Sequence, residues 1–263
     1  MSYNILLLDP KIYKIWFAGQ EYKQKLTKTA KDWCVQEGAD LCFNLGIFSM
    51  STGLGCSYVR AKGKDIAYGN DKPKTLIIDN DNQCKGYSDG IVDGVTKINF
   101  PMGGTRTRNG IGITDKGFII IAQTSHPVTE TVFCNYVNSF VKGKGHKVKL
   151  FTLQDGGGST QEYSNLSKLN FAPEGGRKVA NVICVKFRGK PNISNPLFVS
   201  CPYKSDVELL QMALGGISVD GSFGSGTKSR LTSAQKALGF PQGLQCGIAS
   251  YKTLKSLGFN PVF

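Results

Sequence analysis

The sequence predicts an α+β fold, with a mixed β-sheet head domain that contains few helices and a small C-terminal three-helix bundle. Two patterns support this prediction. In residues 1–191, short β-branched and aromatic runs alternate with glycine-containing breaks, which is typical of strands and turns. In residues 205–263, apolar residues recur at helical spacing in three short segments. The stretch between them, 192–204, carries two prolines and is expected to be a linker.

The head begins with an apolar run, NILLL, that is expected to be its first strand. Further runs have the composition of strands, and they are ADLCFNLGIF, KTLIID, GFIIIAQ, KVKLFTL and KVANVICVKF. Two segments have helical spacing instead: one carries Tyr22, Leu26, Ala30 and Trp33, and the other carries Val132, Tyr136 and Phe140. Strands are therefore expected to outnumber helices in the head.

Three helices are expected in the tail. Ser205 and Glu208 form a capping-box pattern at the start of the first helix. Thr227 is placed to cap the second, and glycines are expected to end the second and the third. A turn-rich loop, VDGSFGSGT at 219–227, joins the first two helices. At about 55 residues such a unit is small enough to depend on a partner domain for stability.

The composition argues against several function classes. The chain has 263 residues and a formal net charge of +13. No stretch approaches the ~18 apolar residues that cross a bilayer, so no membrane insertion is expected. The amino terminus has neither the basic start nor the long apolar run of a secretory signal peptide. No nucleic-acid-binding module is recognisable, so the charge indicates either a Lys-rich solvated surface or an anionic cell-wall polymer as partner.

The cysteines and histidines do not form a metal-binding pattern. Eight cysteines in 263 residues are too dilute for a disulfide scaffold, and they lack the paired spacing of a zinc site. We therefore expect reduced, mostly buried thiols, no bound metal and no cofactor.

One loop carries an unusual run of glycines, LFTLQDGGGSTQEY at residues 150–163. A strand-like run ends there at Asp155, which three glycines, Ser159 and Thr160 follow. Because glycine permits positive φ and close approach of the backbone, an acid beside bare peptide N–H groups is suited to an anionic or sugar ligand. The same residue types are also typical of an ordinary turn. The loop by itself leaves both interpretations open.

Four segments of the head match a set of motifs in a fixed order. FNLGIFS (43–49) stands where the motif set has a strand ending in N-G-G-F-F, and TRNGIGITDKGFIII (107–121) matches R-T-A-x-G-x-x-x-D-G before a strand. LFTLQDGGGST matches a strand with D-G-G-G-S-S/T, and EGGRKVANVICV (174–185) matches E-R-x-V-A-N-x-x-x-V. Together they resemble the phosphodiester glycosidase family, whose animal member removes N-acetylglucosamine to uncover mannose 6-phosphate. Departures at Leu45, Asn109 and Gly176 concern substrate choice more than fold.

This resemblance implies a site for a sugar 1-phosphodiester. Arg108 would hold the phosphate oxygens with its planar fork of donors. An anion nest would be lined by the peptide N–H groups of Gly156, Gly157 and Gly158 and by the hydroxyls of Ser159 and Thr160. Asp155 would act as nucleophile or base at the anomeric carbon. The second carboxylate of a glycosidase would be Glu174, with Glu130 as the alternative.

Three further residues are expected to contact the substrate, and they are Asn44, Arg177 and His126. Each has a structural alternative. Arg108 and Arg177 are equally suited to structural ion pairs, and Asn44 to a turn at the end of a strand. His126 precedes a proline at a strand end and belongs either to the site or to the surface.

Three segments of the tail also match a known pattern. VELLQMAL, VDGSFGSGTKSRLTSAQKALGF and GIASYKTLKSLG, within residues 205–258, contain two helices around a D-G-x-F-G-x-x-T loop and a final helix. They resemble the type 1 peptidoglycan-binding domain, which implies a three-helix fold that holds bacterial cell wall. Gln242 and Gly243 stand where that family usually has a second D-G turn. Asp220 and Gly221 are expected to shape the turn rather than bind wall themselves.

Both resemblances together predict an endolysin-like cell-wall hydrolase. It would be a glycosidase that cleaves a glycosidic or sugar-1-phosphodiester bond in peptidoglycan or in the wall teichoic acid linkage. Its partners would be peptidoglycan and anionic wall polymers. Without a signal peptide, it is expected in the host cytoplasm before release and then at the bacterial wall. The alternative is a non-catalytic protein that binds cell wall or phosphorylated glycans, which includes a virion-associated protein.

Overall fold

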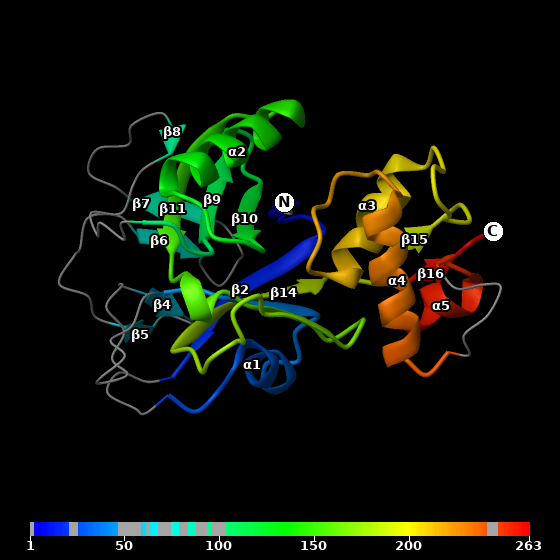
Figure 1. The fold of residues 1–263 in the computed structure, drawn as a ribbon, viewed down its shortest axis with the longest axis horizontal. Helices are drawn as coiled ribbons and strands as arrows, with labels where there is room; N and C mark the ends of the chain where they lie inside the picture. Colours follow the sequence, from blue (N-terminus) through cyan, green and yellow to red (C-terminus); the bar gives the residue numbers. More distant parts are fainter. Residues whose placement is uncertain are drawn as a thin grey trace.

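The computed structural model describes residues 3–20, 26–46, 104–240 and 247–263, together with the backbone of short strands between residues 59 and 95. Within these ranges the fold is mixed α+β, with several antiparallel sheets and five helices (Figure 1). The α+β class predicted from the sequence is therefore confirmed. None of the helices in the described ranges is long and apolar enough to cross a membrane.

Two five-stranded sheets form the head. Sheet A has the order β1-β10-β9-β11-β8, with the bounds Tyr3–Leu8, Ile119–Thr124, Asn109–Thr114, Val148–Gln154 and Gly94–Val95. Its first four strands pair antiparallel, and β8 pairs parallel to β11. Sheet B has the order β13-β12-β3-β14-β2, with the bounds Leu169–Phe171, Glu162–Ser164, Leu41–Asn44, Asn181–Phe187 and Tyr13–Gly19. All of its pairs are antiparallel.

The shorter strands pair in twos. β4 (Val59–Ala61) pairs with β5 (Lys64–Ala67), and β6 (Thr75–Ile78) pairs with β7 (Cys84–Tyr87). The runs that were predicted as strands from their β-branched and aromatic content all contain strands, including KTLIID in β6.

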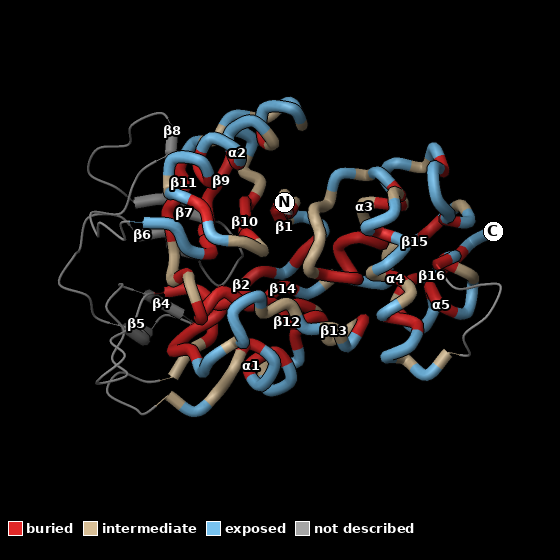
Figure 2. Tube along the Cα trace, viewed as in Figure 1, coloured by how far each residue is buried: buried red, intermediate tan, exposed pale blue. Residues whose placement is uncertain are grey.

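The alternation of side chains along the strands sets the layers of the head. Alternate residues of β1, such as Leu6 and Leu8, face residues of sheet B such as Phe17 and Phe43 in one apolar cluster. Ile5, which precedes Leu6, belongs to the other set of alternate residues and packs on the opposite face of sheet A, against Phe133 and Val137 of α2 (Glu130–Gly143). The outer face of sheet B packs against α1 (Ala30–Gln36) through Trp33 and Cys34. Figure 2 shows the resulting buried interior between the exposed helices.

The first helix begins later than its apolar spacing predicted. Residues 26–29 are not helical, and α1 starts after Thr29. The Thr29 hydroxyl accepts from the Asp32 N–H, and the Asp32 carboxylate accepts from the Thr29 N–H, which is a capping box. This pair fixes the helix start. The predicted contribution of Tyr22 lies outside the described residues.

The tail contains α3 (Lys204–Leu214), α4 (Ser225–Ala237) and α5 (Tyr251–Ser256). The predicted caps of α3 and α4 are wrong. α3 is preceded by Tyr203 without a side-chain cap, and Glu208 instead contacts Lys144, the residue directly after α2. Thr227 lies within α4, where its hydroxyl donates to the Ser222 carbonyl.

The segment 192–204 is packed against the tail. β15 (Asn192–Ile193) pairs in parallel with β16 (Asn260–Pro261) near the end of the chain. Ile193 and Leu197 are buried in the same apolar cluster as residues of α3, α4 and α5. The tail helices therefore share a core with the segment that was expected to be a linker.

Direct hydrogen bonds join the head and the tail. The hydroxyls of Ser164 and Ser167 donate to the carbonyls of Ala213 (2.7 Å) and Leu214 (2.9 Å) at the end of α3. Beside the first strand, the Val219 N–H donates to the Ile5 carbonyl (3.2 Å). These contacts hold α3 and the following loop against both sheets of the head.

Candidate functional site

The glycine loop directly follows β11, and two strand ends fix its first residue. The Asp155 N–H donates to the Leu45 carbonyl (2.9 Å), and Asn44 Nδ2 donates to the Asp155 carbonyl (2.6 Å). Residues Gly157–Ser159 then form a single 3₁₀ turn. The end of β11 is thereby tied to the end of β3, so that Asp155 lies where the two sheets meet.

Close packing explains two of the three glycines. A Cβ atom on Gly156 would lie 2.4 Å from the Thr107 carbonyl oxygen, and one on Gly158 would lie 2.2 Å from Arg177 Nη2. Gly157 has φ +59°, a backbone angle that residues with a side chain rarely adopt. The loop therefore contains glycine because its backbone lies against Thr107 on one side and Arg177 on the other.

The predicted anion nest is largely closed within the loop itself. The Gly157 N–H donates to the Thr107 carbonyl (2.9 Å), and the Thr160 N–H donates to the Gly157 carbonyl (2.9 Å). The Gly156 N–H bonds the Asp155 carboxylate. The prediction of a phosphate-binding nest is thus wrong for Gly156 and Gly157, because their donors serve the protein. The roles predicted for the Gly158 N–H and the Thr160 hydroxyl stay predictions.

Asp155 is half-buried and lies in a positive environment. Burial raises its pKa to about 6. A hydrogen bond from the Ser159 hydroxyl, the charges of Arg177 and Arg106, and the Gly156 N–H act in the opposite direction. A carboxyl group tuned in this way is mostly ionised at neutral pH and is still able to exchange a proton there.

Glu174 lies beside the same loop. Its Oε1 accepts from the Thr107 hydroxyl (2.7 Å) and from the Thr107 N–H (3.3 Å). A Cβ atom on Gly157 would lie 3.8 Å from Glu174 Oε2. The Thr107 hydroxyl oxygen also lies 2.9 Å from the Gly157 carbonyl oxygen, so Thr107 connects Glu174 to the loop that carries Asp155. Two carboxylates, Asp155 and Glu174, therefore belong to one cluster.

The alternative second carboxylate is engaged elsewhere. Glu130 Oε1 lies 3.5 Å from Arg108 Nη1 at the start of α2. The Arg108 guanidinium also donates to the carbonyls of Val128 (3.1 Å) and Gly104. Arg108 is 1% exposed. The prediction that Arg108 binds phosphate is therefore wrong, because its buried guanidinium anchors the chain before β9 and before α2.

Arg106 was not among the residues predicted for the site, but its charge reaches Asp155. It is exposed, and its charge lowers the pKa of Asp155. In the motif R-T-A-x-G, Arg106, Thr107 and Gly110 match three of the four specified residues, and Arg108 stands at the alanine position. Aligning the motif two residues earlier would have identified Arg106.

Arg177 lies against the glycine loop, and its contact with substrate stays a prediction. Its guanidinium lies over Gly158, its N–H donates to the Gly158 carbonyl (3.2 Å), and its charge lowers the pKa of Asp155. Gln161 Nε2 holds the Arg177 carbonyl (2.7 Å). Arg106 and Arg177 thus provide positive charge near Asp155, and Gln161, directly before β12, holds the backbone at Arg177.

Asn44 has a structural position. Its Oδ1 accepts from the Gln161 N–H (3.0 Å) and from Gln123 Nε2 (3.2 Å), and its Nδ2 donates to Asp155. The Asn44 carbonyl accepts from Asn109 Nδ2 (2.6 Å). The side chain is buried and joins both sheets, so Asn44 positions the Asp155 loop.

His126 lies on the β1 side of sheet A. Its ring meets the Tyr3 ring edge to face with centroids 5.4 Å apart, and its Nδ1 lies 3.4 Å from the Ser125 hydroxyl. β1 is separated from β11 by β10 and β9. His126 is therefore grouped with Tyr3, whereas Asp155 follows β11. No cluster of three or more metal-binding side chains occurs among the described residues.

The chain was compared with known proteins. No family model and no curated protein matches it. The zebrafish N-acetylglucosamine-1-phosphodiester alpha-N-acetylglucosaminidase catalytic domain, auto-inhibited by its pro-peptide, is 13% identical with a TM-score of 0.48, over 71% of this chain and 83% of that chain. A hypothetical protein from Synechocystis is 11% identical with a TM-score of 0.51, over 71% of this chain and 59% of that chain. The likeness to the Synechocystis protein is one of fold.

Proposed function

We propose that the protein is a cell-wall hydrolase, a glycosidase that cleaves a glycosidic or sugar-1-phosphodiester bond, with Asp155 as its catalytic carboxylate. One observation carries the proposal: Asp155 has a raised pKa, accepts a hydrogen bond from Ser159, and lies in a loop that Glu174, Arg106 and Arg177 approach from other segments. A perturbed carboxylate beside a second carboxylate and cations is a common feature of catalytic sites.

The chemistry divides between the charged groups. Arg106 and Arg177 hold the phosphate oxygens of the substrate, since guanidinium groups match phosphate geometry. Asp155 acts at the anomeric carbon as the nucleophile, or as the base that deprotonates water. Glu174 donates the proton to the leaving oxygen where the leaving group is an alcohol. A phosphate leaving group is a weak base and needs less of this assistance.

The tail provides the attachment to the wall in this proposal. Its D-G-x-F-G-x-x-T loop and the helical spacing on either side of it resemble the sequence pattern of the type 1 peptidoglycan-binding domain. Peptidoglycan and anionic wall polymers are the partners, and the positive charge of the chain favours the anionic ones. The layout corresponds to an endolysin that collects in the host cytoplasm and reaches the wall after the membrane opens.

Digestion of purified Gram-positive walls tests the proposal. Mass spectrometry of the soluble products should detect phosphorylated polymer or reducing sugar released by the wild-type protein. Asp155→Asn should lose this release and keep its affinity for the walls. Asp115→Asn is the matched control, because Asp115 is exposed on the β9–β10 turn and should retain full activity. Absence of released product from the wild-type protein on all walls would refute the proposal.

A second candidate is a non-catalytic protein that binds phosphorylated glycans. The positive charges of Arg106 and Arg177 near Asp155 favour it, since guanidinium groups bind phosphate oxygens without any chemical step. In that case Asp155→Asn leaves wall affinity intact and no variant changes product release. The same digestion therefore separates the two candidates.

A further inference from the structure

A groove lies between the head and the tail, apart from the Asp155 loop. It has a volume of about 640 Å³. Tyr3 of β1 and Tyr136 of α2 line it on the side of the head. The opposite wall consists of the loop before α4 and one face of α4 itself, including Ser229 and Arg230. We propose that this groove binds an uncharged saccharide chain and holds it in line with the Asp155 site.

The tyrosines form an aromatic surface at the groove. The rings of Tyr3 and Tyr136 are stacked, with centroids 3.6 Å apart and an interplanar angle of 11°. Tyr136 is 42% exposed, whereas Tyr3 is buried and held by the pairing of β1 with β10. An exposed aromatic ring on a fixed support is suited to the apolar C–H face of a sugar ring, and its hydroxyl to the polar edge.

The opposite wall is rich in groups that both donate and accept hydrogen bonds. Ser225, Ser229 and Ser233 are four residues apart and lie on one face of α4. All three are exposed and line the groove. Hydroxyl groups match the hydroxyl and acetamido groups of a neutral saccharide, because each side offers donors and acceptors.

The charged groups of this wall are already engaged. Asp220 Oδ1 accepts from Gln211 Nε2 (2.8 Å) and from the Ser222 N–H (2.8 Å). Arg230 Nε donates to the Gly215 carbonyl (2.8 Å), and Arg230 lies close enough to Glu162 for each charge to affect the other. Because these charges are compensated by the protein, an uncharged ligand suits the groove better than an anionic one.

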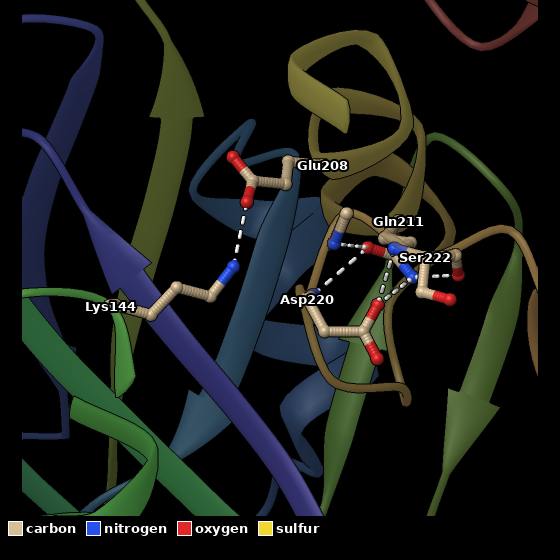
Figure 3. Close-up of polar contacts among 6 residues, drawn as sticks. Lys144, Glu208, Gln211, Asp220 and Ser222 are labelled. Carbon is tan, nitrogen blue, oxygen red and sulfur yellow. Dashed lines mark hydrogen bonds and ion pairs between the residues drawn. The ribbon is translucent and has the colours of Figure 1, made fainter. Parts of the chain in front are cut away.

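The walls of the groove are held in place before a ligand arrives. The Gln211 Oε1 accepts from the N–H groups of Asp220 and Gly221, which fixes the loop, as Figure 3 shows. In the same figure, Lys144 Nζ, directly after α2, contacts Glu208 Oε1 of α3 (2.7 Å), so one ion pair joins the end of α2 to α3. A preformed site loses less conformational entropy on binding.

The register of sheet A aligns the groove with the Asp155 loop. Tyr3 pairs with Thr124 of β10, and Asn109 of β9 pairs with Gln154, the residue before Asp155. Tyr3 and Asp155 therefore lie at the same end of the sheet, separated by three strand spacings, or about 14 Å. A ligand that occupies both places must be a chain of sugars rather than a single one. The inference that the chain continues to Asp155 rests on the proposed function.

Binding measurements on the full-length protein test the groove. The probe is a tetramer of N-acetylglucosamine, an uncharged chain with hydroxyl and acetamido groups, titrated by calorimetry. Tyr136→Ala should weaken its binding by roughly tenfold, which corresponds to about 1.4 kcal/mol. Ser229→Trp should abolish binding by filling the groove. Tyr251→Ala is the control, because Tyr251 is 47% exposed on α5 and does not line the groove.

The possible outcomes separate this inference from the proposed function. Wild-type affinity in both groove variants, or no binding by the wild-type protein, would overturn the inference. Thermal unfolding of each variant checks that it is folded, and Tyr136→Ala remains informative if Ser229→Trp does not fold. Asp155→Asn should bind the tetramer as the wild-type does. If the groove variants lose binding while Asp155→Asn still releases wall products, the groove stands and the catalytic role of Asp155 fails.

Discussion

Glu162 is a carboxyl group buried where the head meets the tail, and its replacement by glutamine is expected to stabilise the protein at alkaline pH. Its Oε1 accepts from the Gly216 N–H (3.0 Å), and its Oε2 accepts from Asn4 Nδ2. Burial raises its pKa to about 7, and Arg230, Gly216 and Asn4 offset only part of this effect. Ionised Glu162 is therefore unfavourable in the folded chain.

The size of the effect follows from linkage. A carboxyl group whose pKa is higher in the folded chain binds a proton more tightly there, so protonation favours folding. This contribution is complete below the ordinary pKa of 4.5 and is lost as the pH rises through about 7. A difference of about 2.5 pH units at 1.36 kcal/mol each corresponds to ~3 kcal/mol. Glutamine does not ionise, so Glu162→Gln avoids this loss.

The surroundings can accept the introduced amide. Asn4 Oδ1 is buried and has no hydrogen-bond partner among the described residues. If the Asn4 side chain rotates by half a turn, this oxygen accepts from the NH₂ group introduced at position 162. The remaining amide oxygen still accepts from the Gly216 N–H. The substitution therefore keeps a hydrogen bond between residues 4 and 162, and the cost of the rotated Asn4 NH₂ group is the same at both pH values.

Urea unfolding at pH 5 and at pH 9 measures the effect. The free energies of unfolding of the wild-type protein and Glu162→Gln should be close at pH 5, and the variant should be about 3 kcal/mol more stable at pH 9. Glu37→Gln is a control, since its amide oxygen can still accept from Trp16 Nε1. A difference that is the same at both pH values would refute the reasoning, as would a variant less stable than the wild-type at pH 9.

Three further predictions follow from the site and the core. Activity should rise with pH through about 6 as Asp155 ionises. Arg177→Gln should move this midpoint to higher pH, because the Arg177 charge lowers the pKa of Asp155. An unchanged midpoint in the pH–rate profile would contradict this. Gly156→Ala should lower the free energy of unfolding, measured in urea, by about 1–3 kcal/mol, because the new Cβ atom would collide with the Thr107 backbone. Gly158→Ala should lower it less, because the Arg177 side chain can move away. Equal losses would count against the close-packing explanation. Cys42 and Cys184 are buried, with their sulfurs 3.1 Å apart. Both should resist iodoacetamide in the folded protein and react in urea, and mass spectrometry of their peptides measures this. Alkylation at equal rates in both states would contradict their burial.

The strands were predictable because their signal is local. β10 and β11 are runs of β-branched, leucine and aromatic residues, and such runs form buried strands in most contexts. Asp155, Glu174 and Arg177 were identified from motifs alone, and their roles at a substrate stay predictions. Five cysteines in the described ranges are buried, as the sequence predicted.

The errors arose where a side chain depends on distant partners. Arg108 was assigned to phosphate, but its acceptors are the carbonyls of Gly104 and Val128 and the carboxylate of Glu130. Val128 and Glu130 follow β10, so the whole β9–β10 hairpin separates them from Arg108 in the sequence. The glycine loop was expected to offer free N–H groups, but Thr107, 50 residues earlier, accepts one of them. No pattern within the loop itself indicates that partner.

The pairing of β15 with β16 determines where this chain can be divided. A fragment that begins at residue 205 would lose the strand that pairs with Asn260–Pro261, together with buried Ile193 and Leu197. The same cut would expose Glu162 and the inner side of α3 to water. Transplanting the tail onto another enzyme would therefore require Asn192 as the junction and new polar residues on the surface that α3 now shares with the head.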